Sequence, residues 1–446
     1  MSTASGTAPT APDSPAARRK VLIASLVGTT IEWYDFFLYA TAAGLVFPIL
    51  FFPSDDPTVG TLLAFGTFAV GFVARPVGAV IFGHIGDRVG RKQTLVATML
   101  LMGVATALIG LLPPYAAIGV AAPLLLVLLR ILQGVAVGGE WGGAVLLAIE
   151  NAPPGKRGLY GSVPQIGLGL GLALGTGAFA LLAEFLDDET FLAYGWRAAF
   201  LVSVLLVVVG LAVRLTILET PEFRKLQETG TTTKVPAVEL FRTRVHRRGL
   251  GTGMLARWAE GAAFNTWGVF VITYAVTTVG VDRVLVLVAV TAGALLMAVV
   301  TPLAGLLADR FGRRRVFGTG AVLFGLSVIP SFLLVGTGVG WIVVVVVLFQ
   351  LGVAYALMTG TQSALYAELF EADVRYTGLS LVYQVSGIYA SGLTPAILTA
   401  LLAAGAGSPW IAGGYLVLTA VISVVTVWVM PRYIGWRPEW TRSEPW

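Results

Sequence analysis

The sequence predicts an all-α membrane protein with twelve transmembrane helices in two six-helix halves. Two observations lead to this prediction: most of the chain is apolar, and one motif recurs at equivalent places in the two halves. Of the 446 residues, 57% are hydrophobic and 12% are charged, and the mean hydropathy is +0.85. A soluble domain carries about 25% charged residues. Lipid is therefore the main solvent of this chain.

Apolar runs of membrane-spanning length follow one another along the chain. A helix needs about 20 residues to cross a bilayer. The predicted spans are Val21–Phe47, Val59–Phe82, Leu95–Leu112, Ile118–Leu147, Val163–Phe185, Ala198–Leu218, Leu250–Val279, Val284–Leu307, Val316–Val335, Trp341–Leu365, Gly378–Leu402 and Ile411–Met430. The 54 glycines agree with this assignment, because small residues let helices approach closely in lipid.

The loops between these spans differ in charge. One side holds nearly all the basic loop residues, namely Arg18, Arg19, Lys20, Arg88, Arg91, Lys92, Lys156, Arg157, Arg224, Lys225, Arg242, Arg244, Arg247, Arg248, Arg310, Arg313, Arg314 and Arg315. The other side holds Arg197 and Arg283 beside acids such as Asp187. Cytoplasmic loops carry the excess of Lys and Arg. The pattern predicts a multi-pass inner-membrane protein with both termini in the cytoplasm, and it explains the net charge of +5 without nucleic acid.

The polar stretches divide the chain into five segments. We expect a disordered cytoplasmic tail, an N-terminal six-helix half, a cytoplasmic linker, a C-terminal six-helix half and a second cytoplasmic tail. Their bounds are residues 1–20, 21–218, 219–248, 249–431 and 432–446. Because both halves lie in one chain, a monomer would suffice for function.

A repeated motif follows the second span of each half. GHIGDRVGRK (residues 83–92) and GLLADRFGRR (residues 305–314) share glycine, aspartate, arginine and a basic pair at the same spacing. Parallel repeats of this kind occur in transporters. A simple basic turn would explain the arginines but not the aspartate and glycine spacing. We expect the aspartates to accept hydrogen bonds from helix N-termini and the motif to form a cytoplasmic gate, made of Gly83, Asp87, Arg88, Gly90, Arg91, Gly305, Asp309, Arg310, Gly312 and Arg313.

These two strings resemble the signature loops of the major facilitator superfamily, whose members have six plus six helices and a substrate site between the halves. Four longer strings resemble the metabolite:proton symporters, which include transporters of proline and betaine, 2-oxoglutarate, citrate and shikimate. They are GTTIEWYDFFLYA (residues 28–40), RPVGAVIFGHIGDRVGRK (75–92), RILQGVAVGGEWGGA (130–144) and ELFEADVRYTGLSLVYQ (368–384). The first half most resembles the shikimate transporter group, through IGVAAPLLLVLLRILQG and DDETFLAYGWRAAF. The resemblance implies proton-coupled uptake of a small organic acid by alternating access.

Several charged residues lie inside predicted spans and are candidates for proton coupling. Glu32 and Asp35 lie one turn apart, roughly 16 to 21 Å along the first span from Val21 at about 1.5 Å per residue. A carboxylate at that depth is costly unless paired, hydrated or protonated. One of the two is therefore a hypothetical proton carrier; neutral carboxyls that hydrogen-bond adjacent helices are the alternative.

Arg130, in the fourth span, either binds a substrate carboxylate or pairs with the carboxyl that is protonated; a static ion pair is the structural alternative. Glu140, farther along the same span, is a second candidate for coupling or gating, and a structural hydrogen bond explains it equally well.

Polar and aromatic residues within the spans predict a substrate cavity. Arg75 is interpreted either as a pathway charge or as a snorkelling anchor, and Arg257 and Glu260, one turn apart, are expected to neutralise each other. The predicted cavity comprises Trp33, Tyr34, Arg75, Gln133, Arg257, Glu260, Asn265, Trp267, Tyr355, Gln362, Tyr383 and Gln384. Hydrogen bonding between helices is the alternative role for the polar members.

Other function classes find little support in the sequence. The chain has no cysteine, and its two histidines, His84 and His246, lie far apart, so no metal site or cofactor is expected. No GxxxxGK[ST] phosphate loop occurs, and the glycines of residues 167–175 lie in an apolar span as a packing face. We therefore predict no enzyme.

Three rival functions remain. The short tail after Met430 argues against osmolyte uptake. The absence of a Gly-Pro signature after the glycines of residues 167–175 argues against drug efflux. The repeated gating loops argue against an uncoupled receptor or channel. The expected partners are a small-molecule substrate, protons and the lipid bilayer.

Overall fold

The computed structural model describes residues 15–89, 91–138, 141–150, 152–215, 240–371 and 374–431. Within these ranges the secondary structure is helical and contains no strand. Ten segments are long and apolar enough to cross a membrane, the shorter apolar helix Val96–Leu111 accounts for the third predicted span, and helix α1 accounts for the first. The predicted twelve-helix architecture is confirmed.

The N-terminal bundle contains the first six spans. Its long helices are α1 (Pro15–Leu45), α3 (Pro57–Val89), α4 (Arg91–Leu111), α6 (Ala121–Val137) with α7 (Trp141–Glu150), α8 (Arg157–Phe185) and α10 (Trp196–Leu215). Short helical segments α2 (Phe47–Leu50), α5 (Tyr115–Ile118), α9 (Asp188–Thr190) and η1 (Phe191–Gly195) connect them.

Three spans of the C-terminal bundle contain π-helical segments, written η. These are α13 (Arg244–Asn265) with η2 (Thr266–Phe270), α14 (Val271–Thr273) and η3 (Tyr274–Val279); α17 (Gly340–Phe349) with η4 (Gln350–Tyr355) and α18 (Ala356–Ala367); and α19 (Arg375–Ser386) with η5 (Gly387–Gly392) and α20 (Thr394–Ala404). The other three spans are α15 (Arg283–Phe311), α16 (Arg313–Val335) and α21 (Trp410–Val429).

Two helix starts differ from the sequence prediction. Helix α1 begins at Pro15, inside the expected tail, because proline is pre-organised for the first helical turn and the following Ala, Arg and Lys favour helix. Helix α13 begins at Arg244, inside the expected linker, and Thr243 caps it by accepting a hydrogen bond from the amide of His246. The rest of the expected linker lies outside the described residues.

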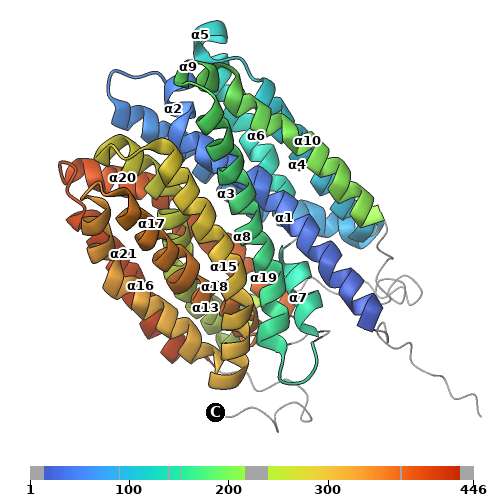
Figure 1. Ribbon diagram of the computed structural model, residues 1–446. Coiled ribbons are helices and arrows are strands. Elements are labelled where there is room, and N and C mark those ends of the chain that lie inside the picture. Colours follow the sequence, from blue (N-terminus) through green and yellow to red (C-terminus); the bar gives the residue numbers. More distant parts are fainter. Residues whose placement is uncertain are drawn as a thin grey trace, which may run out of the picture.

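The two bundles pack side by side, with α8 and α15 in contact along the interface between them (Figure 1). Helix α1 packs against α8 within the N-terminal bundle. Helix α3 packs against η5 and α20 across the interface between the bundles. Within the N-terminal bundle, α3 and α6 approach closely because Gly134 has no side chain. A Cβ atom at that position would collide with the Gly71 carbonyl. Gly71 in turn leaves room for the side chain of Arg130. This close crossing places Arg75 and Arg130 near each other in the bundle interior.

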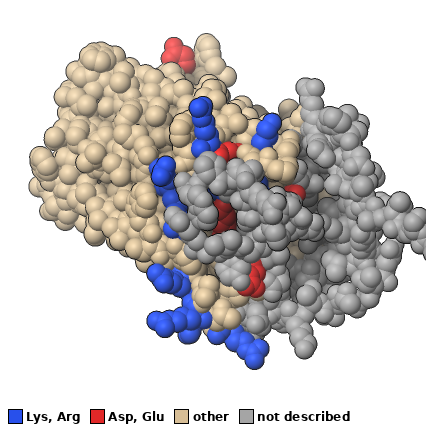
Figure 2. All heavy atoms as spheres, turned by 90° about the horizontal axis from the view of Figure 1, so that it is seen from below, with Lys and Arg blue, Asp and Glu red and all other residues tan. Residues whose placement is uncertain are grey.

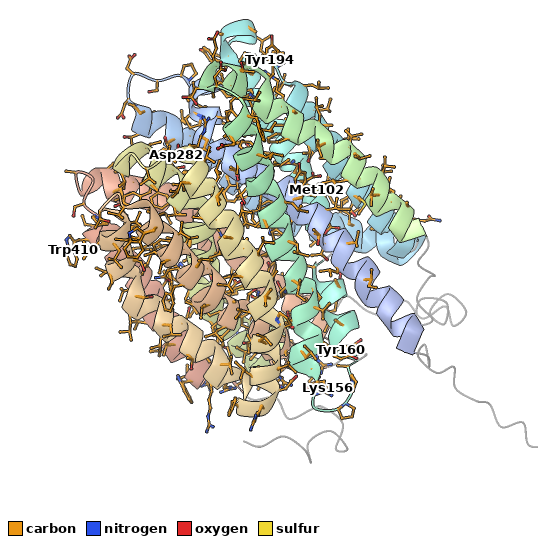
Figure 3. The ribbon with its side chains drawn as sticks, viewed as in Figure 1. Met102, Lys156, Tyr160, Tyr194, Asp282 and Trp410 are labelled. Carbon is orange, nitrogen blue, oxygen red and sulfur yellow. The ribbon has the colours of Figure 1, made fainter. Side chains whose placement is uncertain are left out.

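Contacts join the bundles at one end of the molecule, where α8 begins and α15 ends. We call this the basic end because Lys156 lies there (Figure 3), together with Arg310 near the end of α15 and Arg313 at the start of α16. Figure 2 views the molecule from this side and shows Lys and Arg side chains around the face. Asp309 accepts hydrogen bonds from the amides of Gly158 and Leu159, at 2.7 and 3.0 Å. Two free amides at the start of α8 thus receive a carboxylate from the other bundle.

The opposite end of the interface is also bridged. Arg283 forms an ion pair with Asp188, with 2.8 Å between Nη2 and Oδ1. The Thr273 hydroxyl donates a hydrogen bond to the Gly44 carbonyl at 3.2 Å. The two bundles are therefore joined at both ends of their interface.

Candidate functional site

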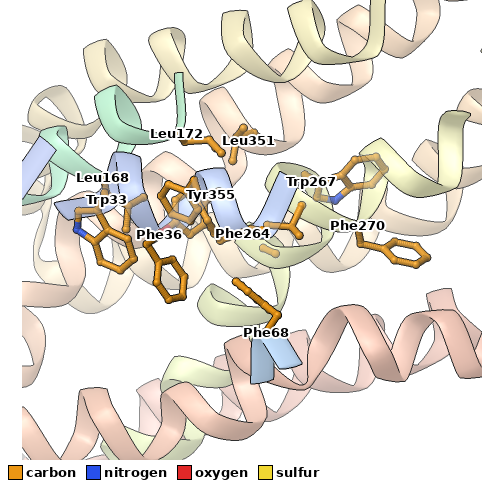
Figure 4. Close-up of a cluster of buried hydrophobic side chains, with 14 of the residues drawn as sticks. Trp33, Phe36, Phe68, Leu168, Leu172, Phe264, Trp267, Phe270, Leu351 and Tyr355 are labelled. Atoms are coloured by element: carbon orange, nitrogen blue, oxygen red, sulfur yellow. The ribbon is translucent and has the colours of Figure 1, made fainter. Parts of the chain in front are cut away.

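A cavity of about 20 Å3 lies between the two bundles, which is room for one water molecule. The N-terminal bundle lines it with Trp33, Phe36, Phe37, Phe72, Arg75 and Leu168. The C-terminal bundle lines it with Arg257, Glu260, Gly261, Phe264, Asn265, Tyr355, Tyr383 and Ser391. Figure 4 shows part of this aromatic wall, with Trp33, Phe36 and Phe264 in one cluster.

Arg75 faces this cavity from α3 and is only 1% exposed. Its guanidinium carbon lies 4.1 Å from the ring centroid of Phe72, 4.4 Å from that of Phe36 and 5.5 Å from that of Trp33. Its Nε and Nη2 atoms are buried without a hydrogen-bond partner, and no described acidic side chain forms an ion pair with it. The aromatic faces stabilise the cation, but the two nitrogens stay available to an anion.

Arg130, on α6, is fully buried in a second aromatic cage, 4.1 Å from the Tyr39 centroid and 4.2 Å from the Phe36 centroid. Its Nη1 donates to the Oε1 of Gln133 at 3.0 Å, and the Nε2 of Gln133 donates to the Thr106 hydroxyl at 2.8 Å. Nε and Nη2 of Arg130 have no hydrogen-bond partner. Arg130 is thus held by neutral groups and reaches no carboxylate directly.

Asp35 completes this chain of side chains from α1. It is 1% exposed, its carboxyl group lies beside the Thr106 hydroxyl, and its Oδ1 is buried without a hydrogen-bond partner. Thr106 therefore contacts both Asp35 and Gln133, so that Asp35, Thr106, Gln133 and Arg130 form a continuous polar chain across α1, α4 and α6. Of the other predicted coupling residues, Glu32 is partly buried on α1, and Glu140 lies outside the described residues.

Arg257 and Glu260 on α13 form the local ion pair that their spacing predicts, with 3.4 Å between Nε and Oε2. Glu260 also accepts hydrogen bonds from the Tyr355 hydroxyl at 2.8 Å and from the Gln362 amide at 3.1 Å. The Nη1 of Arg257 donates to the Ser386 hydroxyl at 3.2 Å. Both charges are neutralised inside the C-terminal bundle.

Asn265 lines the cavity eight residues after Arg257, on the same face of α13. Its Nδ2 donates to the Gly261 carbonyl at 2.9 Å, and its Oδ1 is buried without a partner. Trp267 points elsewhere: its ring packs on Phe332, with centroids 5.3 Å apart, and it does not line the cavity (Figure 4). Trp267 follows Asn265 by two residues, and the rotation of the helix over two residues turns the two side chains in different directions.

Four other residues of the predicted cavity also lie outside its lining. The Tyr34 hydroxyl donates to the Ala199 carbonyl on α10 at 2.9 Å, and Gln133 belongs to the polar chain of Arg130. Gln362 lies behind Glu260. Gln384 donates to the Gly138 carbonyl across the two bundles at 2.8 Å. Each of these side chains lies on a face of its helix that contacts a neighbouring helix. This is the role in hydrogen bonding between helices that the sequence left open as the alternative.

Sequence reasoning missed the apolar lining and Ser391, because aromatic and small residues occur throughout the spans and carry no pattern of their own. It also missed the contact that closes the cavity toward the basic end. Trp141 on α7 stacks on Tyr383 on α19, with ring centroids 3.6 Å apart and planes at 13°.

The repeated motif is described in the second half only. Asp309 binds the start of α8, and Arg313 pairs with Asp309, at 3.8 Å, and with Glu368. Gly305 packs on the Gly158 carbonyl, Gly312 has a φ of 92° that favours glycine, and Arg310 is exposed. The side chains of Asp87, Arg88 and Arg91, and the backbone of Gly90, lie outside the described residues; Gly83 lies within α3. The gating role of both motifs stays a prediction.

Comparisons with known proteins place these features in a family. Residues 20–234 match the family described as "Sugar (and other) transporter", and residues 253–443 match the "Major Facilitator Superfamily". The inner membrane metabolite transport protein YhjE of Escherichia coli (strain K12) is 46% identical over 85% of this chain and 87% of its own length. The shikimate transporter of the same organism is 40% identical over 92% of this chain and 94% of its own.

More distant matches agree. The glycine betaine/proline/ectoine/pipecolic acid transporter OusA of Dickeya dadantii (strain 3937) is 33% identical over 92% of this chain and 82% of its own length. Among solved structures, that of a D-xylose-proton symporter has the same fold, with a TM-score of 0.71 at 17% identity over 94% of this chain and 99% of that one. The resemblance predicted from the motifs is confirmed: the chain belongs to the major facilitator superfamily, among the metabolite transport proteins that include the shikimate transporter.

Proposed function

We propose that this chain imports a small organic acid together with protons, by alternating access between its two halves. One observation carries the proposal. Arg75 lies in the cavity between the halves, almost fully buried, and two of its nitrogens have no partner. A buried guanidinium is costly unless an anion compensates it, and a substrate carboxylate can bind it bidentately.

The balance of buried charge supports an anionic substrate. Among the described side chains that are at most 3% exposed, the cations Arg75, Arg130 and Arg257 outnumber the acids Asp35 and Glu260. Glu260 is already paired with Arg257. If Asp35 takes up a proton, the described N-terminal half loses the one negative charge among these buried side chains, and its buried charge becomes more positive. Entry of a proton at Asp35 therefore favours entry of a carboxylate near Arg75, which links the two movements.

The small cavity and the contacts at both ends of the interface support alternating access. A cavity of about 20 Å3 cannot hold an organic acid, so the halves must separate for the substrate to enter. The contacts Asp309 to Gly158 and Gln384 to Gly138 must break to open the basic end, and the contact of Arg283 with Asp188 must break to open the other. By the positive-inside rule, we expect the basic end to face the cytoplasm.

A second candidate is uptake of a betaine-type osmolyte, because aromatic faces line the cavity and bind quaternary ammonium groups. OusA, a relative at 33% identity, carries glycine betaine in its name. The Arg75 guanidinium already occupies the faces of Phe36 and Phe72, however. Fewer aromatic faces are therefore free for a quaternary ammonium group, and we rank osmolyte uptake below uptake of an organic acid.

The test is a transport panel in proteoliposomes, with shikimate, quinate, citrate, 2-oxoglutarate, proline and glycine betaine. We expect an inward-directed proton gradient to drive accumulation of an organic acid, and a protonophore to abolish it. Arg75→Leu should lower uptake of that acid at least 100-fold, as expected when one partner of a buried charged pair is lost. Arg315→Leu, at an exposed site outside both the cavity and the repeated motif, is the control. Accumulation of betaine or proline alone, with no acid transported, would contradict the proposal.

A further inference from the structure

Four residues of the cavity wall have buried polar atoms without a hydrogen-bond partner. Two of these atoms, Nε of Arg257 and Oε2 of Glu260, face each other at 3.4 Å in an ion pair, and the others belong to Arg75 and Asn265, on opposite halves. Arg75 on α3 offers the donors Nε and Nη2, and Asn265 on α13 offers the acceptor Oδ1. The charges of Arg257 and Glu260 are paired with each other, and Tyr355 donates a hydrogen bond to the Oε1 of Glu260. We call Arg75 and Asn265 the two poles of the cavity, because each has hydrogen-bonding atoms without a partner and they lie on opposite walls. Only the pole at Arg75 suits a carboxylate.

The amide of Asn265 can face the cavity in one orientation only. The Gly261 carbonyl, 2.9 Å from the amide nitrogen, can only accept a hydrogen bond. The nitrogen must therefore point to Gly261, and the oxygen must point into the cavity. Asn265 is 3% exposed, so this oxygen is shielded from water, and leaving it unpaired is costly. The pole calls for a hydrogen-bond donor on the substrate.

The backbone around this pole is irregular in the way that functional sites often are. In the described part of the chain, π-helical segment η2 begins directly after Asn265, η4 ends at Tyr355, and η5 contains Ser391. All three residues line the cavity. A Cβ atom at Gly261 would lie 2.6 Å from the Ser391 hydroxyl oxygen, so the serine sits beside the same turn of α13. The irregular turns thus converge on the Asn265 pole.

The chemistry of the pole narrows the donor to a hydroxyl group. A second carboxylate would face the Asn265 oxygen and the Glu260 carboxylate, both of which repel it. An ammonium group would find Glu260 already paired with Arg257, and Arg75 in the opposite wall. A hydroxyl group donates to Asn265 without adding charge.

We infer that Asn265, with Ser391 beside it, forms a hydroxyl-binding subsite, and that the substrate is a hydroxylated monocarboxylate whose carboxylate binds Arg75. This rests on the proposed function and adds the substrate class and its orientation. The substrate bridges the two halves, so its two ends contact helices that must move relative to each other during transport.

The experiment compares shikimate with cyclohex-1-ene-1-carboxylate, the same ring acid without hydroxyl groups, in proton-driven uptake by proteoliposomes. Wild-type protein should prefer shikimate. Asn265→Leu should lower shikimate uptake by about 10- to 100-fold, the loss expected for one buried hydrogen bond, and should leave the uptake of the deoxy acid within about twofold. Thr266→Val is the matched control, because Thr266 is equally buried and its hydroxyl bonds to the Ala262 carbonyl of its own helix.

The outcomes separate the two proposals. Equal losses of both acids in the Asn265→Leu variant would overturn the subsite and leave proton-coupled acid transport standing. Competition between the two acids on wild-type protein gives a second readout that needs no variant, and equal inhibition by both would also overturn the subsite. Failure of wild-type protein to transport any organic acid would instead contradict the proposed function itself.

Discussion

The two halves of the molecule hold their buried charges in opposite ways. In the C-terminal half, Arg257 and Glu260 form an ion pair, and Tyr355, Gln362 and Ser386 satisfy much of what remains. In the N-terminal half, Arg75 and Arg130 lie in aromatic cages without a carboxylate partner. A paired charge has little reason to change its state, whereas an unpaired charge favours the binding of an anion. We therefore propose that the charge that varies during transport lies in the N-terminal half, and that the paired charges of the C-terminal half do not change.

The largest expected effect tests this difference through stability. Glu260→Leu leaves the Arg257 cation buried and uncompensated, which should cost about 3 to 5 kcal/mol, and adding Arg257→Met should restore most of it. Arg75→Leu removes a cation that has no counter-charge, so stability should stay unchanged or rise. Thermal unfolding in detergent can be followed by tryptophan fluorescence, because the chain has 11 tryptophans and no cysteine for thiol-reactive dyes. Equal destabilisation by Glu260→Leu and Arg75→Leu would break the comparison.

A smaller effect is expected within the N-terminal half. Thr106→Val keeps the shape of the side chain but removes the hydroxyl that contacts both Asp35 and Gln133. Loss of one buried hydrogen bond corresponds to about tenfold in rate or affinity. Proton-driven accumulation should fall by about that factor in Thr106→Val. It should persist in Thr106→Ser, which keeps the hydroxyl. If the serine variant is impaired as much as the valine variant, Thr106 acts through packing alone.

The smallest effect concerns the ion pair at the end opposite the basic end. Asp188 is 84% exposed, so its contact with Arg283 is weak and screened by salt. Asp188→Asn should change the uptake rate by less than about fivefold, equivalent to under about 1 kcal/mol, and the change should vanish at high salt. A large effect that persists at high salt would make this pair a main determinant of closure.

Much of the fold followed from hydropathy, because membrane spans are long and nearly continuous in apolar residues. The start of α1 was placed too late, since Arg18, Arg19 and Lys20 are polar but still favour helix. Hydropathy reports where a helix meets water and not where its hydrogen bonding begins.

The site was predicted less completely. Charged residues such as Arg75 and Glu260 stood out against an apolar background, and both line the cavity. Trp267 and Gln362 were assigned to it without knowledge of helical phase, which only packing fixes. Thr106 gave no signal, because a threonine in a membrane helix usually bonds to its own backbone, as this one also does. Its second role depends on Asp35 and Gln133, which lie far from it in sequence.

The central claim is that the N-terminal half carries the proton and that the C-terminal half does not. It is tested most directly by proton entry into proteoliposomes loaded with a pH-sensitive dye, measured during uptake of an organic acid by wild-type, Asp35→Asn and Glu260→Gln proteins. The account predicts that protons enter with substrate in the wild-type and Glu260→Gln proteins. In Asp35→Asn, substrate exchange should continue without proton entry. Proton entry through Asp35→Asn, or its loss in Glu260→Gln alone, would contradict the account.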